Sequence, residues 1–275
     1  MKRIAYPRLT AVISAALVFF IVAASNLIAQ HASSGGRSDG GSDSRPEGET
    51  DLTAEEIITR LEENRTYETS RAELTMVIRD RFGERESTMI AWSRGADEAL
   101  IEFTSTAERG QKVLRTADEI YLYYPDAAEL VRLQGAALRE SMLGSDVSYE
   151  DLTGGKSILD TYDVEFVDTE EIDGYDTYEV TLEARRGNVA YPKQTMWIDT
   201  ELFMTRRSEQ YALSGRLLKT ITFHDIEEID GHSVPIRTVV SDALKRNSST
   251  TVVIDDFEIG LSLSDDTFSL EELSW

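Results

Sequence analysis

Three histidines, His31, His224 and His232, are the side chains most readily associated with chemistry in this sequence. His224 and His232 flank a tight turn, and with Asp225 and Asp230 nearby they offer the nitrogen and oxygen donors that zinc prefers. Hairpin spacing need not bring these four side chains onto one face, so we interpret both histidines as polar residues of a turn. We therefore predict no metal site.

Other catalytic patterns are incomplete. The segment 154–157, Gly-Gly-Lys-Ser, resembles the end of a phosphate-binding loop, but the required first glycine would fall at position 150, which is Glu150. There is no Gly-x-Ser-x-Gly elbow, and carboxylates are too numerous to single out a catalytic pair. The chain has no cysteine, which excludes disulfides, thiolate chemistry and lipid attachment through an N-terminal cysteine. We predict a protein without catalytic residues or cofactor.

The excess of acidic residues limits which kinds of partner the protein can bind. The 275 residues include 51 acidic and 28 basic ones, a net charge of −23, which repels phosphate backbones and makes nucleic acid an unsuitable partner. An acidic surface also keeps proteins soluble in salty habitats, and this explanation stays open. A hydrophobic content of 41% suits a globular protein with a substantial core.

The N-terminal segment 1–29 reads as an export signal, because Lys2, Arg3 and Arg8 precede an uncharged apolar run. The run is nearly as long as the ~20 residues that span a bilayer, so a retained membrane anchor is the alternative. Either way we expect the body of the protein outside the cytoplasm, in the periplasm. Segment 30–51 is rich in Ser, Gly and Asp and is predicted to be a flexible linker before a folded domain at 52–275.

The domain is predicted to be mainly β. A capping box at 53–56 starts a helix over 54–64, and runs of alternating apolar residues then predict about eleven or twelve strands joined by short turns. Short connections favour an antiparallel meander, because parallel pairing needs long crossovers. We expect an unclosed antiparallel β-barrel, a highly curved sheet whose concave apolar face is covered by two or three helices. The predicted strands are 71–79, 87–93, 98–104, 112–116, 119–124, 162–169, 175–184, 193–199, 203–213, 217–229, 234–241 and 250–259.

One central segment interrupts the strands. Apolar residues from Leu130 to Leu143 recur at roughly helical spacing, and Gly144, Ser145 and Asp146 then supply a stop and a turn. We predict a lid made of this helix, 133–143, and the helix 54–64, lying across the concave face.

Apolar and aromatic residues exceed what one sheet needs for its own packing. A packed core is a sufficient explanation for each of these residues taken singly. A partly hollow concave face would explain the surplus as a whole, and methionine there would adapt to varied apolar ligands. The candidate cavity and lid residues are Met76, Met89, Trp92, Phe103, Tyr121, Tyr123, Leu133, Leu138, Met142, Leu143, Met196, Phe203, Tyr211 and Phe223.

Four segments carry a family resemblance: 142–152 (MLGSDVSYEDL), 196–199 (MWID), 215–220 (GRLLKT) and 228–237 (EIDGHSVPIR). In this order they resemble the periplasmic outer-membrane lipoprotein-sorting proteins related to the LolA carrier, over about 52–275. The resemblance implies a cavity that shields the acyl chains of a lipoprotein or lipid. It also implies an association with inner-membrane transporters of the resistance-nodulation-division (RND) type. We expect structural roles for the signature turn, in which Gly144 turns the chain, Asp146 and Ser148 brace it and Tyr149 pins it to the sheet; Ser145 and Asp151 complete the set.

The expected function is that of a monomeric periplasmic carrier, whose cargo enters between the concave sheet and the lid and is transferred to the outer membrane. One alternative is an accessory subunit that docks on an RND-type transporter without ferrying cargo. Another is a secreted lipid hydrolase, which would need a nucleophile and a base, such as His224 or His232, converging in the cavity.

Overall fold

The computed structural model describes residues 50–273 apart from 66, 96, 117–118, 153–156 and 188. The predicted export signal, His31 and nearly all of the predicted linker lie outside the described residues, as does the Gly-Gly-Lys part of segment 154–157. Helix α1, Ala54–Asn64, has the predicted bounds. Its capping box is complete, because the Thr53 hydroxyl accepts from the Glu56 N–H and the Glu56 carboxylate accepts from the Thr53 N–H.

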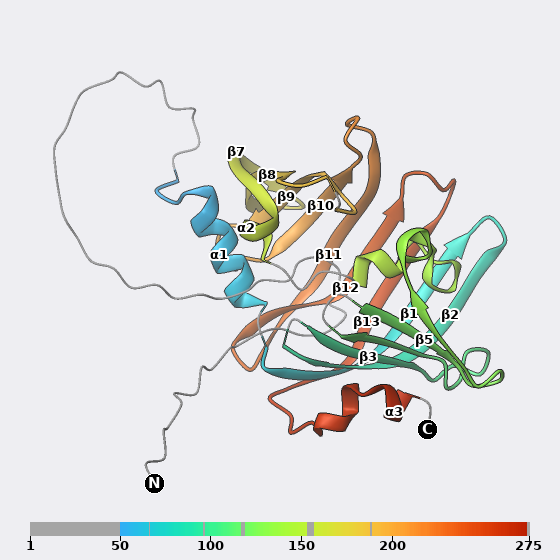
Figure 1. Ribbon diagram of the computed structural model, residues 1–275. Helices are drawn as coiled ribbons and strands as arrows, with labels where there is room; N and C mark the ends of the chain where they lie inside the picture. The colour runs from blue at the N-terminus through green and yellow to red at the C-terminus, as the bar shows by residue number, and fades with distance from the viewer. Residues whose placement is uncertain are drawn as a thin grey trace, which may run out of the picture.

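The described strands form one antiparallel sheet of 13, in the order β6-β5-β4-β3-β2-β1-β13-β12-β11-β10-β9-β8-β7. Two meanders are thus joined where β1 pairs with β13. The sheet curves strongly and its edge strands, β6 and β7, are at opposite ends (Figure 1). The predicted unclosed curved sheet is confirmed. The strands are β1 Thr69–Asp80, β2 Gly83–Arg94, β3 Glu98–Phe103, β4 Lys112–Thr116, β5 Glu119–Tyr124, β6 Glu129–Leu133, β7 Tyr162–Ile172, β8 Tyr175–Ala184, β9 Lys193–Asp199, β10 Thr205–Tyr211, β11 Leu217–Ile229, β12 His232–Asp242 and β13 Ser249–Ile259.

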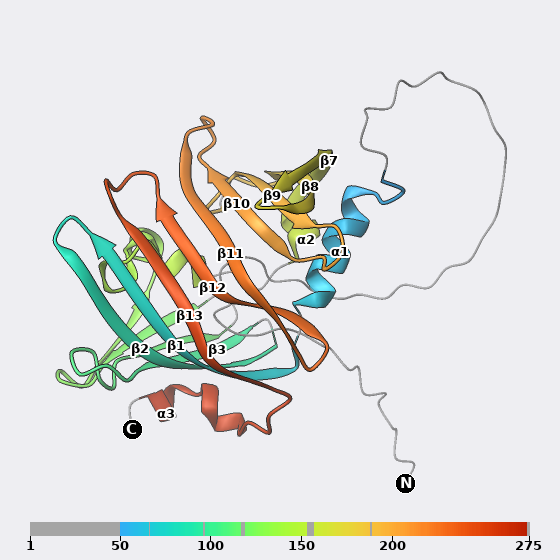
Figure 2. The same ribbon diagram turned by 180° about the vertical axis from the view of Figure 1, so that it is seen from behind.

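The residues from 134 to 152, which follow edge strand β6, lie on the concave side (Figure 1). We call residues 134–152 the lid. The lid contains three 3₁₀ turns, η1 Gly135–Arg139, η2 Met142–Gly144 and η3 Tyr149–Leu152, and helix α2, Ile158–Thr161, follows it. At the C-terminus, η4, Asp265–Phe268, and α3, Leu270–Leu273, pack on the outer face of β3 and β4 (Figure 2).

The predicted helix 133–143 is wrong. Leu133 ends an edge strand, β6, which pairs with β5 through Ile120, and sequence analysis missed this strand. After it, Gly135 has a positive φ of 57°, and Glu140 and Ser141 are extended. These conformations interrupt helical hydrogen bonding, so the segment forms short 3₁₀ turns.

Candidate ligand-binding face and its lid

An apolar cluster fills the space between the lid and the concave face of the sheet. Met142, Val147, Tyr149 and Leu152 of the lid pack there against buried side chains of β1 to β5 and β11 to β13. The larger sheet residues in this cluster are Leu74, Met76, Ile78, Met89, Ile101, Phe103, Val113, Ile120, Leu122, Leu133, Ile221, Phe223, Val234, Val240, Val252, Ile254 and Phe257.

A second apolar cluster lies at the other end of the sheet. Ile57, Ile58 and Leu61 of α1 are fully buried there against Val180 on β8 and Met196 on β9. Helix α1 therefore covers the β7 to β9 end, while the lid covers the rest. Helix α1 covers its cluster as a helix, as predicted, whereas the non-helical lid takes the place of the predicted helix 133–143.

A polar row separates the two clusters. Gln194 on β9 pairs with Gln210 on β10, which pairs with Lys219 on β11, and Ser208 lies one row away on the same face. All four are buried. Within the described part of the chain, the Gln194 and Gln210 Oε1 atoms and the Ser208 Oγ have no hydrogen-bond partner. The concave face thus contains unused hydrogen-bonding capacity, which is costly to bury.

The sequence-predicted cavity residues divide between the two faces of the sheet. Trp92, Tyr121 and Tyr123 lie on the outer face, packed around Leu114 and Phe268. Residues next to them in sequence point inward, because side chains alternate along a strand. The lid-side cluster contains Met76, Met89, Phe103, Leu133, Leu138, Met142, Leu143 and Phe223.

Three predicted residues lie elsewhere. Met196 belongs to the cluster under α1. Phe203 has a positive φ of 46° in the turn after β9 and stands beside the Tyr178 ring, with 6.2 Å between centroids. Tyr211 donates to Glu209, which raises the Tyr211 pKa to about 12 together with the larger effect of burial. The structure therefore does not bring all fourteen candidates together.

A small pocket lies beneath η3 on the concave face. Ala99, Ile101, Val113, Arg115 and Leu152 line it, and its volume of ≈ 10 Å³ is about the space that one water molecule needs. Drug-sized ligands typically occupy ~300–1,000 Å³. A larger apolar ligand can enter only if the lid moves away from the sheet.

Asp146 fastens the middle of the lid to the β12–β13 hairpin. Its carboxylate accepts hydrogen bonds from the hydroxyls of Thr250 and Ser248, each at 2.9 Å, and its N–H bonds to the Thr250 Oγ1 at 2.8 Å. The Asp242 N–H adds a longer bond of 3.4 Å. Asp146 is only 2% exposed, so these polar bonds are made inside the protein. The bracing role expected of Asp146 is consistent with this geometry.

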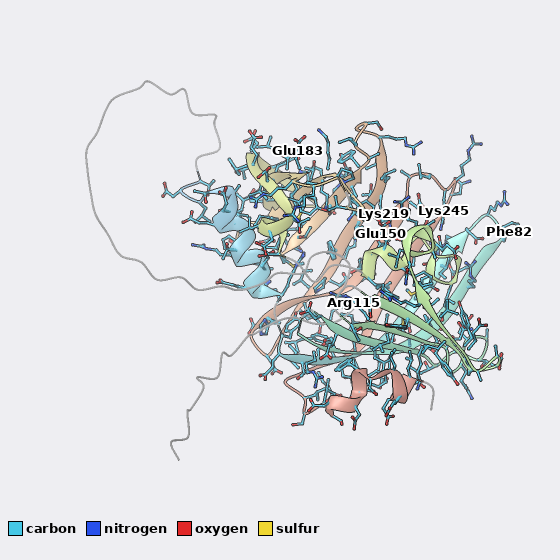
Figure 3. The ribbon with its side chains drawn as sticks, in the orientation of Figure 1. Phe82, Arg115, Glu150, Glu183, Lys219 and Lys245 are labelled. Atoms are coloured by element: carbon cyan, nitrogen blue, oxygen red, sulfur yellow. The ribbon has the colours of Figure 1, made fainter. Side chains whose placement is uncertain are left out.

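Two basic side chains fasten the same part of the lid from the outer ends of hairpins. Lys245 donates to the Ser141 hydroxyl at 2.8 Å and to the Ser145 carbonyl, and the Arg85 Nη2 donates to the Leu143 carbonyl at 3.0 Å. Figure 3 shows Lys245, Lys219 and Glu150 gathered around the lid. The lid is therefore held to the sheet by charged groups as well as by packing.

Asp151 fastens the end of the lid. Its carboxylate forms a buried ion pair with Lys219 and accepts from the Tyr191 hydroxyl, and it also accepts from the Ser148 N–H and Oγ at 2.7 and 3.0 Å. The Lys219 Nζ lies 5.5 Å from the Tyr191 ring centroid. Burial, and next to it the Asp151 charge, raise the pKa of Tyr191 far above its usual range. Tyr191 therefore remains a neutral donor.

Helix α1 is attached to α2 through Glu62. Its carboxylate accepts from the Ile158 N–H at 2.7 Å and from the Ser157 hydroxyl. Burial is the largest influence and raises the Glu62 pKa to about 7, against the lowering effect of these bonds. Arg65, at the end of α1, donates to the Thr205 Oγ1 at 2.5 Å, and burial lowers its pKa to about 10.

The two histidines of the domain do not converge. His224 contacts the Thr222 hydroxyl at 2.7 Å, and the His232 Nδ1 contacts the Asn64 carbonyl at 3.1 Å. Burial lowers the His224 pKa. No group of three potential metal ligands occurs among the described residues.

Sequence analysis missed most of the residues that hold the lid. Lys219, Tyr191, Lys245, Thr250 and Arg85 lie far from the lid in sequence, so local patterns could not identify them. A weak signal existed for Lys219, because it falls in the family-like segment 215–220.

A long antiparallel sheet that curves around an apolar face under a covering lid is a LolA-like architecture, and solved structures share it. The chain resembles a DUF1329 family protein from Desulfovibrio piger, with a TM-score of 0.74 and 24% identity over 79% of this chain and 96% of that one. It also resembles a protein described as an outer membrane lipoprotein-sorting protein domain from Vibrio parahaemolyticus, with a TM-score of 0.74 and 21% identity over 81% and 98% of the two chains. A LolA superfamily protein from Nitrosomonas europaea gives a TM-score of 0.68 and 24% identity over 80% and 99%.

A family model described as "Uncharacterized protein" matches residues 95–275, more than half of the chain, so the chain belongs to that family. At 21–24% identity the three solved structures establish the fold, and they confirm the LolA-like architecture expected from the sequence. No curated protein matches the sequence. Among the described residues, no helix is both long and apolar enough to cross a bilayer.

Proposed function

We propose that this protein is a carrier that binds the acyl chains of a lipoprotein or lipid between the concave face and the lid. The observation that supports it best is the lid itself, whose apolar side chains cover the largest apolar cluster while polar bonds at Asp146, Asp151 and Lys245 fasten it. A lid fastened by exchangeable polar bonds opens without unfolding the sheet. When the lid moves away, the apolar concave surface of the sheet becomes accessible to a hydrocarbon chain.

The energetics of acyl binding fit such a lid. A chain of about 14 to 16 carbons gains on the order of 10 kcal/mol on burial, at ~0.8 kcal/mol per methylene. Opening the lid must offset much of this gain, since otherwise cargo would not be released. The polar row at Gln194, Ser208 and Gln210 would meet the hydrogen-bonding groups of an amphiphile, such as ester or amide groups.

The site of action follows from the same proposal. With the apolar segment 1–29 acting as an export signal or anchor, the carrier would work in the periplasm. An RND-type transporter in the inner membrane is the partner that the sequence resemblance implies. We propose binding rather than catalysis as the activity.

A second candidate is an accessory subunit of such a transporter that does not ferry cargo. One observation favours it: the pocket under η3, at ≈ 10 Å³, is far smaller than a typical ligand site. On this view the lid stays closed, and the protein acts through contacts between its outer surfaces and the transporter.

Native mass spectrometry of protein purified from a lipid-containing host separates the two candidates. A carrier is expected to contain phospholipid or an acylated peptide, and Ala99→Leu, which adds bulk to the concave face beneath the lid, should reduce its amount. Leu270→Ala is the control, since Leu270 is exposed on α3 at the outer face. A folded protein that is always empty and takes up no added lipid would favour the accessory subunit.

A further inference from the structure

Three neighbouring hairpins turn at the same edge of the sheet. The strand order β2-β1-β13-β12-β11-β10 places the β1–β2, β12–β13 and β10–β11 hairpins side by side. Because neighbouring strands lie ~4.8 Å apart, successive hairpins are about 10 Å apart. Figures 1 and 2 show the three turns projecting together along one edge. We call the turns 79–85, 212–217 and 242–248 the basic edge.

Each of these turns exposes one large apolar side chain. Phe82 is 81% exposed, Leu213 77% and Leu244 57%, which makes them the three most exposed large apolar side chains of the described residues. Figure 3 shows Phe82 at the outer end of its hairpin. Side-chain hydrogen bonds brace two of the turns, because the N–H groups of Phe82 and Leu244 bond to the carboxylates of Asp80 and Asp242 at 2.7 and 2.8 Å. The exposure is therefore a feature of the turn geometry.

Each apolar side chain is accompanied by an exposed arginine. The Arg81 guanidinium lies 4.5 Å from the Phe82 ring centroid, Arg216 follows Leu213 in the same turn, and Arg246 follows Leu244. None of the three arginines has an ion pair with a described residue. They are available to an anionic partner.

The opposite edge has the opposite character. We call the turns 168–176, 199–204 and 225–232 the acidic edge, because they contain eleven acidic residues and no lysine or arginine. The basic edge has six basic and three acidic residues. In a protein of net charge −23 this contrast orients the molecule, since an anionic surface repels the acidic edge more strongly than the basic edge.

We propose that the basic edge docks on an anionic lipid surface. Phe82, Leu213 and Leu244 would enter the interface between headgroups and acyl chains, and the arginines would contact headgroup phosphates. Three separate projections suit a fluid, planar surface, whereas a protein partner buries a contiguous patch. The inference rests on the proposed function, because a lipid carrier must meet a membrane to load or deliver its cargo.

Docking at this edge would also act on the lid. The β1–β2 hairpin holds the Leu143 carbonyl through Arg85, and the β12–β13 hairpin holds Ser141 and Ser145 through Lys245. Headgroup phosphates would compete for these two cations. The lid would then be loosened where cargo is exchanged and stay closed in solution.

A fluorescent label tests the docking directly. The chain has no cysteine, so Leu213→Cys provides a single site for a polarity-sensitive dye in the full protein. Leu202→Cys, in the acidic edge and 38% exposed at the native leucine, is the matched control. With vesicles of equal parts phosphatidylglycerol and phosphatidylcholine, the dye at 213 should shift to shorter wavelength and the dye at 202 should not. Vesicles of phosphatidylcholine alone should shift neither.

Charge variants test the role of the arginines. Arg81→Gln, Arg216→Gln and Arg246→Gln together should weaken binding to the anionic vesicles about tenfold or more. The same charge change at Arg60, Arg132 and Arg237, outside this edge, should leave binding unchanged. All variants contain residues 1–29. Membrane binding through this segment therefore cannot explain a difference in dye shift between positions 213 and 202.

Two results would overturn the docking proposal: no shift at 213, which would point to an acidic protein as the occupant, or an equal shift at 202. The vesicle assay needs no bound cargo. Its failure is therefore distinct from failure of the carrier proposal, which would appear as a protein that never contains lipid.

Discussion

At the scale of single residues, buried polar side chains decide how the lid is held. Asp151 and Lys219 are 4% and 6% exposed at their side chains and form an ion pair between the lid and β11. Taking two charges out of water is costly, so the pair stabilises the protein only because each charge has its partner. Removing one charge leaves the other buried without its ionic partner.

We therefore predict a strong coupling between these two residues. Asp151→Asn and Lys219→Met should each lower the free energy of unfolding by about 3–5 kcal/mol. The double variant should lose much less than the sum, because it leaves no unpaired buried charge. Urea unfolding of the four proteins checks this, and additive losses would contradict it.

For Ser208 we predict the opposite effect, a gain in stability on substitution. Its hydroxyl is fully buried and makes no hydrogen bond to a described residue, so Ser208→Ala should raise the free energy of unfolding by about 1 kcal/mol. Ser70 is equally buried, but its hydroxyl contacts that of Ser93 at 2.9 Å. Ser70→Ala should lower stability by a similar amount. Thermal unfolding compares the two, and a destabilising Ser208→Ala would show that its hydroxyl has a role in the closed protein.

At the scale of elements, the α1–α2 contact should depend on pH. Burial raises the Glu62 pKa from 4.5 to about 7. Between these values the folded state keeps the proton while the unfolded state loses it, so the free energy of unfolding falls as pH rises. Below pH 4.5 the carboxyl is protonated in both states, and above about pH 7 the loss is complete.

Glu62→Gln removes this contribution. The variant should therefore gain stability relative to the wild type as pH rises through this window, measured by urea unfolding at several pH values. Glu63→Gln, a change at the exposed neighbour on α1, controls for the loss of one negative charge. A Glu62→Gln difference that does not change with pH would contradict the assignment.

The lid contains two glycines that form a natural comparison. Gly135 and Gly144 both have positive φ, 57° and 73°, so alanine is strained at either. A Cβ at 144 would also lie 2.9 Å from the Arg85 Nη2 and displace the guanidinium that holds the Leu143 carbonyl, whereas a Cβ at 135 meets nothing within 4 Å.

Gly144→Ala should thus loosen the lid more than Gly135→Ala. Hydrogen exchange of the Ser145 N–H, which bonds to the Met142 carbonyl, is the measurement. Exchange should be faster in Gly144→Ala than in Gly135→Ala. Equal rates would mean that Arg85 contributes nothing to lid closure.

Elements with local signals were predictable. The capping box set the start of α1, and Asp173-Gly174 and Asp230-Gly231 both adopt the positive φ expected of tight turns. Strand β6 was missed because it is a short edge strand. Its residues are mostly exposed, so its apolar side chains also fit the spacing of a helix. The lid conformation could not be predicted, since it depends on contacts with Thr250 and Lys219, many residues away.

At the scale of the whole molecule, the sequence predicted the curved sheet better than it predicted which residues line its concave face. Alternating patterns identify which residues share a face but not which face is concave. Trp92, Tyr121 and Tyr123 thus face η4 and α3, because the C-terminal segment covers the outer surface. The basic edge was hidden by the overall charge, since only the strand order brings its three turns together.

The central claim is that the lid opens to admit acyl chains, and a reversible lock tests it. The Asp146 N–H lies 2.8 Å from the Thr250 Oγ1, so Asp146→Cys with Thr250→Cys places two thiols at the lid's attachment, and the chain has no other cysteine to compete. Uptake of a fluorescent fatty acid should be lost in the oxidised double variant and restored on reduction. Equal uptake by the oxidised and reduced forms would contradict the account.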